Sequence, residues 1–363
     1  MFLLKAFTYI IIVARVKASK AREREIMSKN LLPVTPEVNM PVTPTINQTG
    51  KKGKQPKRSP GEKNGWQRLK NQKALLLMSL PFVIWLIVFR YLPVLGWTMA
   101  FQDYQPQNSF FEQSWVGLKH FRDLFNEPTF YRALENTIGM GILGLVFGTL
   151  AAITFALLLN EMRFTKLKKL TQTISYLPHF VSWVIVANIV TTMLSISGPV
   201  NNLLTSIGLV DSPINFMARP GMFWGVVTAA EVWKSTGWNA IIYFAAMAGT
   251  DPQLYEAAKV DGASRWRQMW HITLPSIRPV IIVLLILNIG NLINIGFEKQ
   301  MLLGNNIVSE RALVIDLYAL NYGIGMFRYS FGTAIGIFKS VISVILIVVA
   351  NSVAKKVGEG RVF

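Results

Sequence analysis

The strongest constraint on the fold of this chain is a series of long apolar stretches. An α-helix needs about 20 mostly apolar residues to cross the hydrocarbon core of a membrane. Six windows of the 363-residue sequence are predicted to be such helices. They cover residues 74–97, 137–159, 174–196, 221–249, 279–296 and 333–350. The sequence therefore predicts an all-α integral membrane protein with six transmembrane helices.

The positive charge of the chain is concentrated at its N-terminus. The formal net charge is +18, and residues 1–73 supply +12 of it, with 16 Lys and Arg against 4 Asp and Glu. The other residues carry only +6, and 52% of the whole chain is hydrophobic. This distribution argues against nucleic acid as a partner and favours a basic tail that faces anionic lipid headgroups.

Basic residues between the windows predict the orientation in the membrane, because cytoplasmic loops are enriched in Lys and Arg. With the N-terminus inside, the inside segments hold 27 Lys and Arg and the outside segments hold 8. The pattern predicts a multi-pass membrane protein with both termini cytoplasmic.

The ends of the chain flank a predicted membrane domain at residues 74–356. Residues 1–73 are predicted to be a largely disordered cytoplasmic tail, and residues 357–363 a short cytoplasmic tail. Residues 1–26 contain an apolar run followed by basic residues, which reverses the order of a signal peptide. They either belong to the tail or precede a true translation start at Met27.

The loop between the fourth and fifth windows, residues 251–278, has the clearest local signals. Asp251 can cap a helix that begins with Pro252 and continues to about residue 260. Asp261 and Gly262 follow, and glycine ends a helix at little cost because it tolerates a positive φ.

A second short helix is predicted after this turn. Ser264 can cap it, and Pro275 is expected to end it. Trp266, Met269 and Trp270 are expected on one side of the hairpin with charged residues on the other. An apolar face outside the bilayer needs a partner.

The same loop resembles the signature loop of ABC-importer permeases, which has the form EAA-x3-G followed by I-x-LP. The matching residues are Glu256, Ala257, Ala258, Gly262, Ile272, Leu274 and Pro275. Further stretches resemble the carbohydrate-uptake branch, which is related to the maltose-type permeases, and most of all its permeases for oligosaccharides and polysaccharide fragments. They are residues 115–125, 130–138, 198–204 and 231–238. The resemblance extends from about residue 70 to the C-terminus.

This resemblance implies a six-helix permease domain in a bacterial-type plasma membrane, which works with several partners. They are a second homologous permease in a heterodimer, two cytoplasmic ATPase subunits, an extracytoplasmic sugar-binding protein, and the carbohydrate itself. Residues 251–275 would be a coupling loop on the ATPase, in which Glu256 meets a basic residue and Gly262 provides a sharp turn. The expected coupling residues are Glu256, Ala257, Ala258, Asp261, Gly262, Ala263, Leu274 and Pro275. The alternative is an amphipathic hairpin on the membrane surface.

No catalytic, cofactor or metal residues are predicted. Gly332, Gly336 and Lys339 do not have the spacing of a phosphate-binding loop, so ATP and magnesium are expected on the partner ATPase alone. The chain has no cysteine, and its three histidines are far apart.

Polar residues within the windows are candidates for the substrate path. Glu231 and Lys234, three residues apart, are predicted to pair, either beside the path or as a neutralised structural pair. Trp233 and Trp238 flank them and could stack on a sugar ring or mark the membrane interface.

The fifth window carries a stripe of three amides. Asn288, Asn291 and Asn294 could hydrogen-bond a polyhydroxylated ligand or join neighbouring helices. Gly141, Gly144 and Gly148 include a G-x3-G pair, Gly144 and Gly148, that is expected to serve close helix packing. Pro178 and His179 are expected to kink the third window or to line the path.

Two other functions compete with an ABC permease. An ion-gradient-driven secondary transporter would show two related halves and a coupling-ion carboxylate, and an intramembrane enzyme would show clustered catalytic residues. Obligate co-purification with an ATPase would favour the permease, and autonomous gradient-driven uptake would favour the secondary transporter.

The charge distribution makes a topology prediction. A reporter fused after residue 125 should lie outside the membrane and one fused after residue 268 should lie inside, because basic loops stay cytoplasmic. Paired phosphatase and fluorescent-protein fusions measure this, and the opposite signal at either position would refute the six-span topology.

Overall fold

The apolar windows become the longest helices of the computed structural model, which describes residues 73–356. The first window forms α3 (Lys73–Leu86), which continues as the π-helical η1 (Ile87–Tyr91) and the 3-10 helix η2 (Leu92–Phe101). The other long helices are α5 (Pro128–Glu161), α9 (Pro220–Met247), α12 (Leu274–Gly290) and α16 (Tyr329–Lys356). The predicted tails, residues 1–73 and 357–363, and the question of a start at Met27 lie outside the described residues, except for Lys73.

The third window is broken into two helices. α6 (Thr165–Phe180) and α7 (Trp183–Met193) meet at an angle of 103°. Pro178 lies in the last turn of α6, and Ser182 caps α7 by accepting a hydrogen bond from the Ile185 N–H at 3.5 Å. The kink predicted near Pro178 is confirmed, but the prediction of one helix over residues 174–196 is wrong.

Four helical stretches of the described chain are long and apolar enough to cross a membrane. They are Leu76–Phe101, Pro128–Glu161, Arg265–Gly290 and Tyr329–Lys356. The bent pair α6 and α7 adds a fifth if it crosses as one span. α9 covers the fourth predicted window, but it carries Glu231 and Lys234 and is not among them. The protein is thus an all-α membrane protein with four or five apolar spans, and the sixth stays a prediction.

Short elements connect the long helices. Two strands, β1 (Gln102–Asp103) and β2 (Ser114–Trp115), pair antiparallel with Gln102 opposite Trp115. The short helices are α4 (Lys119–Asn126), α8 (Pro199–Ser206), η3 (Phe216–Ala218), α10 (Pro252–Val260), α11 (Arg265–Gln268), η4 (Met269–Thr273), α13 (Glu298–Leu303), α14 (Ser309–Ala312), α15 (Ile315–Ala319) and η5 (Leu320–Gly325).

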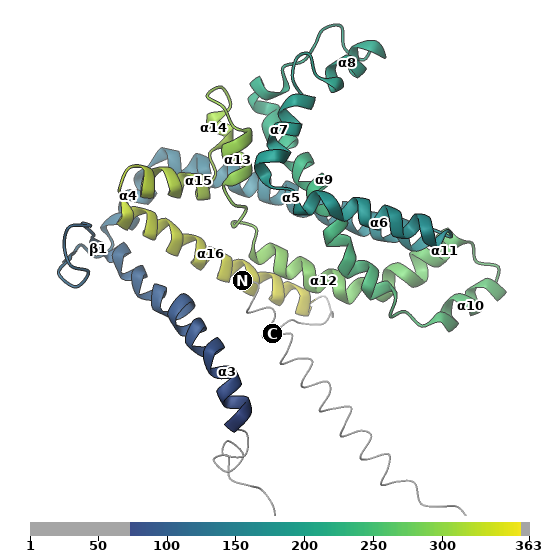
Figure 1. Ribbon diagram of the computed structural model, residues 1–363, viewed down its shortest axis with the longest axis horizontal. Helices are drawn as coiled ribbons and strands as arrows, with labels where there is room; N and C mark the ends of the chain where they lie inside the picture. Colours follow the sequence, from purple (N-terminus) through teal and green to yellow (C-terminus); the bar gives the residue numbers. More distant parts are fainter. Residues whose placement is uncertain (1–72, 357–363) are drawn as a thin grey trace, which may run out of the picture. The chain divides into compact units, whose positions relative to one another are not determined.

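The long helices pack side by side. α9 lies along α5 and α6, and α12 lies beside α16 (Figure 1). One cluster of buried side chains joins α5, α9 and α12 around Ala156, Tyr243 and Ile277. This cluster supports the loop between α9 and α12, because Met269 belongs to it.

Glycines allow close packing of the chain at several positions, but not at the expected pair, Gly144 and Gly148. A Cβ at Gly148 would meet nothing within 4 Å, and one at Gly144 would make only an ordinary contact with Glu231. The prediction that this pair packs closely against another helix is therefore wrong within the described chain. Gly141, the third glycine of the prediction, does pack closely, but against the turn that follows α12, since a Cβ there would lie 2.5 Å from the Leu292 carbonyl oxygen. Gly237 makes a close contact between helices, because a Cβ there would lie 2.1 Å from the Ser175 carbonyl oxygen of α6.

The contact of α9 with α6 makes a testable prediction. A Cβ at Gly237 would overlap the backbone of Ser175, so Gly237→Ala should force the two helices apart. We expect the free energy of unfolding to fall by about 1–3 kcal/mol, as is typical of overpacking. Gly225→Ala is the matched control, because it lies on the same helix with nothing within 4 Å of the added carbon. Thermal unfolding in detergent compares the two, and equal stability of both variants would contradict the packing.

Candidate functional site

The first half of the loop between α9 and α12 has the predicted local structure. Asp251 accepts a hydrogen bond from the Gln253 N–H at 3.0 Å, and α10 begins at Pro252 and ends at Val260. Gly262 follows with φ +73°, a conformation that favours glycine because it has no Cβ. The helix and the turn predicted from Asp251 and Gly262 are confirmed.

The second half differs from its prediction. Ser264 accepts a hydrogen bond from the Arg267 N–H at 3.4 Å, which caps α11 as expected. The helix does not end at Pro275, because α11 continues through η4 into α12 as one helical stretch, Arg265–Gly290. In η4 the Leu274 N–H bonds to the Met269 carbonyl, five residues back. This wider turn directly before Pro275 lets the helix pass a residue that lacks an N–H donor.

The loop exposes apolar side chains on its outer surface. Val260 is 88% exposed, Trp266 65% and Trp270 58%. Met269, which was expected on the same face as the tryptophans, is instead buried in the helix core beside Tyr243. The tryptophans therefore remain available to a partner, while Met269 fixes the loop to the protein.

Three contacts hold the two halves of the loop together and attach it to its neighbouring helices. The Tyr255 hydroxyl and Thr273 Oγ1 lie 3.0 Å apart, and Thr250 Oγ1 and Ser276 Oγ lie 2.8 Å apart. Arg265 donates to the Glu161 carbonyl at 3.4 Å. These contacts give the loop a defined position at the ends of α5, α9 and α12.

The predicted coupling residues occupy different parts of this loop. Glu256, Ala257 and Ala258 lie on α10, where Glu256 is exposed and makes no hydrogen bond or ion pair with any other described residue. The turn contains Asp261, Gly262 and Ala263, and the start of α12 contains Leu274 and Pro275. The Glu256 carboxylate is thus free to meet a positive charge outside the chain.

Glu231 and Lys234 do not pair with each other as predicted. The Lys234 ammonium donates to the carbonyls of Pro178 at 3.1 Å and His179 at 2.6 Å, whereas Glu231 pairs with Lys299 of α13. The break after α6 explains this choice, because the last turn of a helix leaves carbonyls that a side chain can reach. The Pro178 carbonyl also accepts from the Val181 N–H at 3.2 Å. The side chain of Lys299 is only 5% exposed, and the sequence signal for it was weak, since it follows the fifth window in a predicted outside loop.

Aromatic rings surround this charged group. Trp238 stacks on His179 with ring centroids 4.5 Å apart and planes within 2°. The Lys234 and Lys299 ammonium groups lie 5.8 and 6.0 Å from the Trp183 ring. Trp233 stays 50% exposed, so it is the more accessible of the two predicted tryptophans.

The three asparagines do not form one helical stripe, because α12 ends at Gly290. Asn291, which directly follows α12, donates to the carbonyl of Leu287 in the last turn of that helix at 2.9 Å. Asn294 donates to Ser343 of α16 at 2.9 Å, as expected for a group that joins helices. Asn288 is exposed on α12, and of the three side-chain amides it alone has no hydrogen-bond partner among residues 73–356.

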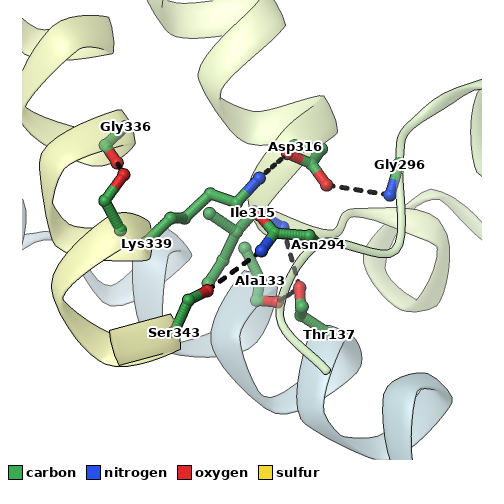
Figure 2. A network of polar contacts seen from close by, with 10 residues as sticks. Ala133, Thr137, Asn294, Gly296, Ile315, Asp316, Gly336, Lys339 and Ser343 are labelled. Atoms are coloured by element: carbon green, nitrogen blue, oxygen red, sulfur yellow. Dashed lines mark hydrogen bonds and ion pairs between the residues drawn. The ribbon is translucent and has the colours of Figure 1, made fainter. Parts of the chain in front are cut away.

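A polar network follows the end of α12 (Figure 2). Asp316 of α15 accepts from the Gly296 N–H at 2.9 Å and pairs with Lys339 of α16. Thr137 of α5 accepts from the Ile315 N–H at 2.8 Å. The sequence did not single out Asp316, which lies in a loop before the sixth window, so the partner of Lys339 was missed. The network ties the end of α12 to α5, α15 and α16.

Comparison with known proteins places this architecture in a family. A family model described as "Binding-protein-dependent transport system inner membrane component" matches residues 144–359. The chain is 45% identical over 297 residues to the polygalacturonan/rhamnogalacturonan transport system permease protein YteP of Bacillus subtilis (strain 168), covering 82% of this chain and 92% of that protein. It is 30% identical to the arabinooligosaccharides transport system permease protein AraP of the same strain, covering 80% and 91%.

A solved structure agrees in fold and sequence. A chain in the crystal structure of a bacterial ABC transporter involved in the import of the acidic polysaccharide alginate has 40% identity and a TM-score of 0.73. The match covers 80% of this chain and 98% of that chain. The chain belongs to the family of inner membrane components of binding-protein-dependent transport systems.

Proposed function

We propose that this chain is the permease subunit of an ATP-driven importer that translocates an oligosaccharide or other carbohydrate delivered by an extracytoplasmic binding protein. The observation that carries the proposal is 45% identity with a permease for polygalacturonan and rhamnogalacturonan over 82% of the chain. The alginate transporter was also crystallised with a periplasmic protein bound to an alginate pentasaccharide. No finding supports the ion-gradient-driven alternative.

The remaining partners follow from this assignment. The permease pairs with a second homologous permease, and two cytoplasmic ATPase subunits supply the energy. The chain has no phosphate-binding loop of its own, so ATP and magnesium bind only to the ATPase subunits. Both termini and the loop of residues 251–275 lie on the cytoplasmic side.

The loop is the proposed docking element for an ATPase subunit. Val260, Trp266 and Trp270 supply exposed apolar surface, which is typical of a binding site when several such side chains lie together. The free carboxylate of Glu256 adds a charge for a basic residue of the ATPase. Gly262 sets the angle between α10 and α11.

The turn at Gly262 gives a test of coupling. Gly262→Val should distort the turn, because a β-branched residue is strained at φ +73°. We expect at least a tenfold loss of sugar-stimulated ATP hydrolysis in the reconstituted complex, if the strained turn costs about 1.4 kcal/mol or more of ATPase binding.

Gly208→Val is the matched control for this substitution. Gly208 has φ +70° and open space around it, but it lies after α8, far along the chain from the loop. Co-purification of the ATPase should survive this change and fall in Gly262→Val. Equal retention of the ATPase in both variants would count against the docking role.

The substrate path is proposed to pass Asn288 and Trp233. A sugar that leaves water must replace its hydrogen bonds, and the exposed amide of Asn288 has none within the described chain. Trp233 presents an exposed ring on which a sugar can stack. Glu231, Lys234, Trp238, Asn291 and Asn294 have partners in their own chain and are proposed to shape the path rather than to bind the sugar.

Substitutions of two asparagines distinguish a role in sugar binding from a role in helix assembly. Asn288→Ala should lower uptake roughly tenfold, if a lost hydrogen bond costs about 1.4 kcal/mol in the occluded state, while the complex assembles normally. Asn294→Ala should instead weaken assembly, because it removes the bond to Ser343. Uptake assays with quantified membrane insertion measure both effects. Normal uptake by Asn288→Ala would exclude this residue from the path.

A further inference from the structure

The first helix of the loop is bonded to the start of α12 through side-chain hydroxyls. Thr273 is fully buried, and its Oγ1 lies 3.0 Å from the Tyr255 hydroxyl. The second pair, Thr250 and Ser276, is exposed at 2.8 Å. Because an exposed hydrogen bond competes with water, the Tyr255–Thr273 pair makes the firmer attachment.

Thr273 occupies the point at which the loop becomes α12. It is the last residue of the π-helical η4, and Pro275 follows two residues later. Short π-helical turns interrupt the regular hydrogen-bond ladder and occur frequently at functional sites. The Tyr255 hydroxyl therefore contacts the helical stretch at its irregular turn.

The other end of the same stretch is also fixed. Asn294 bonds to Ser343 of α16, and Gly296 bonds to Asp316 of α15, which pairs with Lys339 (Figure 2). α12 thus connects the loop at one end with α15 and α16 at the other. A displacement of α10 reaches α12 through the Tyr255–Thr273 bond.

We infer that Tyr255 is a positioning residue that holds α10 at a fixed orientation to α12, so that movement of the docked ATPase moves α12. The inference rests on the proposed function of the loop. Tyr255 contacts neither sugar nor nucleotide. It acts through Thr273, and its loss separates ATP hydrolysis from transport.

The complete complex tests this inference in proteoliposomes that contain the second permease, both ATPase subunits and the binding protein. A mixture of galacturonate oligosaccharides serves as the probe, and the measured quantity is the sugar transported per ATP hydrolysed. Tyr255→Phe and Thr273→Val each remove one hydroxyl and keep the shape of the side chain. Each should lower this ratio about three- to tenfold, the range expected for one lost hydrogen bond.

Three further variants make the result specific. Thr273→Ser retains the hydroxyl and should restore most of the ratio. The double variant Tyr255→Phe/Thr273→Val should be no worse than either single variant, because both remove the same bond. Tyr131→Phe is the matched control, since the Tyr131 hydroxyl bonds to the Phe125 carbonyl away from the loop.

The outcomes separate this inference from the proposed function. An unchanged ratio in Tyr255→Phe, additive losses in the double variant, or an equal loss in Thr273→Ser would overturn the role of the hydroxyl pair. A wild-type complex whose ATP hydrolysis does not respond to the binding protein and the probe would instead contradict the proposed function, and the inference with it.

Discussion

The structure depends on one constraint, which is that polar groups inside a membrane have no water to bond with. Three lysines that are buried or half-buried among the described helices have protein partners. Lys299 pairs with Glu231, Lys339 pairs with Asp316, and Lys234 donates to two carbonyls at the end of α6. The broken third window is tolerated in part because Lys234 donates to the His179 carbonyl and adds a second donor to the Pro178 carbonyl. The charges thus hold together elements that are far apart in the sequence.

The same constraint separates fixed polar groups from available ones. The side-chain amides of Asn291 and Asn294 donate hydrogen bonds within the chain, whereas that of Asn288 has no partner in the described chain. On the loop, Thr273 and Met269 are buried and Glu256, Trp266 and Trp270 are exposed. Groups with partners hold the helices in place, and groups without them are the candidates for sugar and ATPase.

Local signals allowed much of this architecture to be predicted from sequence. Asp251 before Pro252 and Gly262 after Asp261 act within one turn, so the start of α10 and its end near residue 260 were predicted. The apolar windows were predicted for the same reason, because helix length and hydropathy are local properties. The family resemblance rested on the loop between α9 and α12, and the family match confirms it.

Some of the incorrect predictions depend on contacts distant in sequence, and one depends on a local turn without a clear signal. Spacing alone favoured a Glu231–Lys234 pair, but Lys299 is 68 residues from Glu231 and its approach depends on how α13 packs. Pro275 was expected to end a helix, and the π-helical turn that lets the helix pass it has no clear sequence signal. The predicted stripe of asparagines was wrong because α12 ends at Gly290. Gly290 packs closely against Ile347 of α16, a contact that the sequence does not reveal.

The loop of residues 251–275 is proposed to dock on an ATPase subunit, and cross-linking of this loop to that subunit tests the contact. The chain has no cysteine, so a single introduced cysteine is the only thiol of this subunit. Val260→Cys, at a site 88% exposed beside the turn, should cross-link to the ATPase in native membranes. Phe111→Cys, at a site 91% exposed between the two strands, should not. Cross-linking at residue 111, or none at residue 260, would contradict docking of the loop on the ATPase.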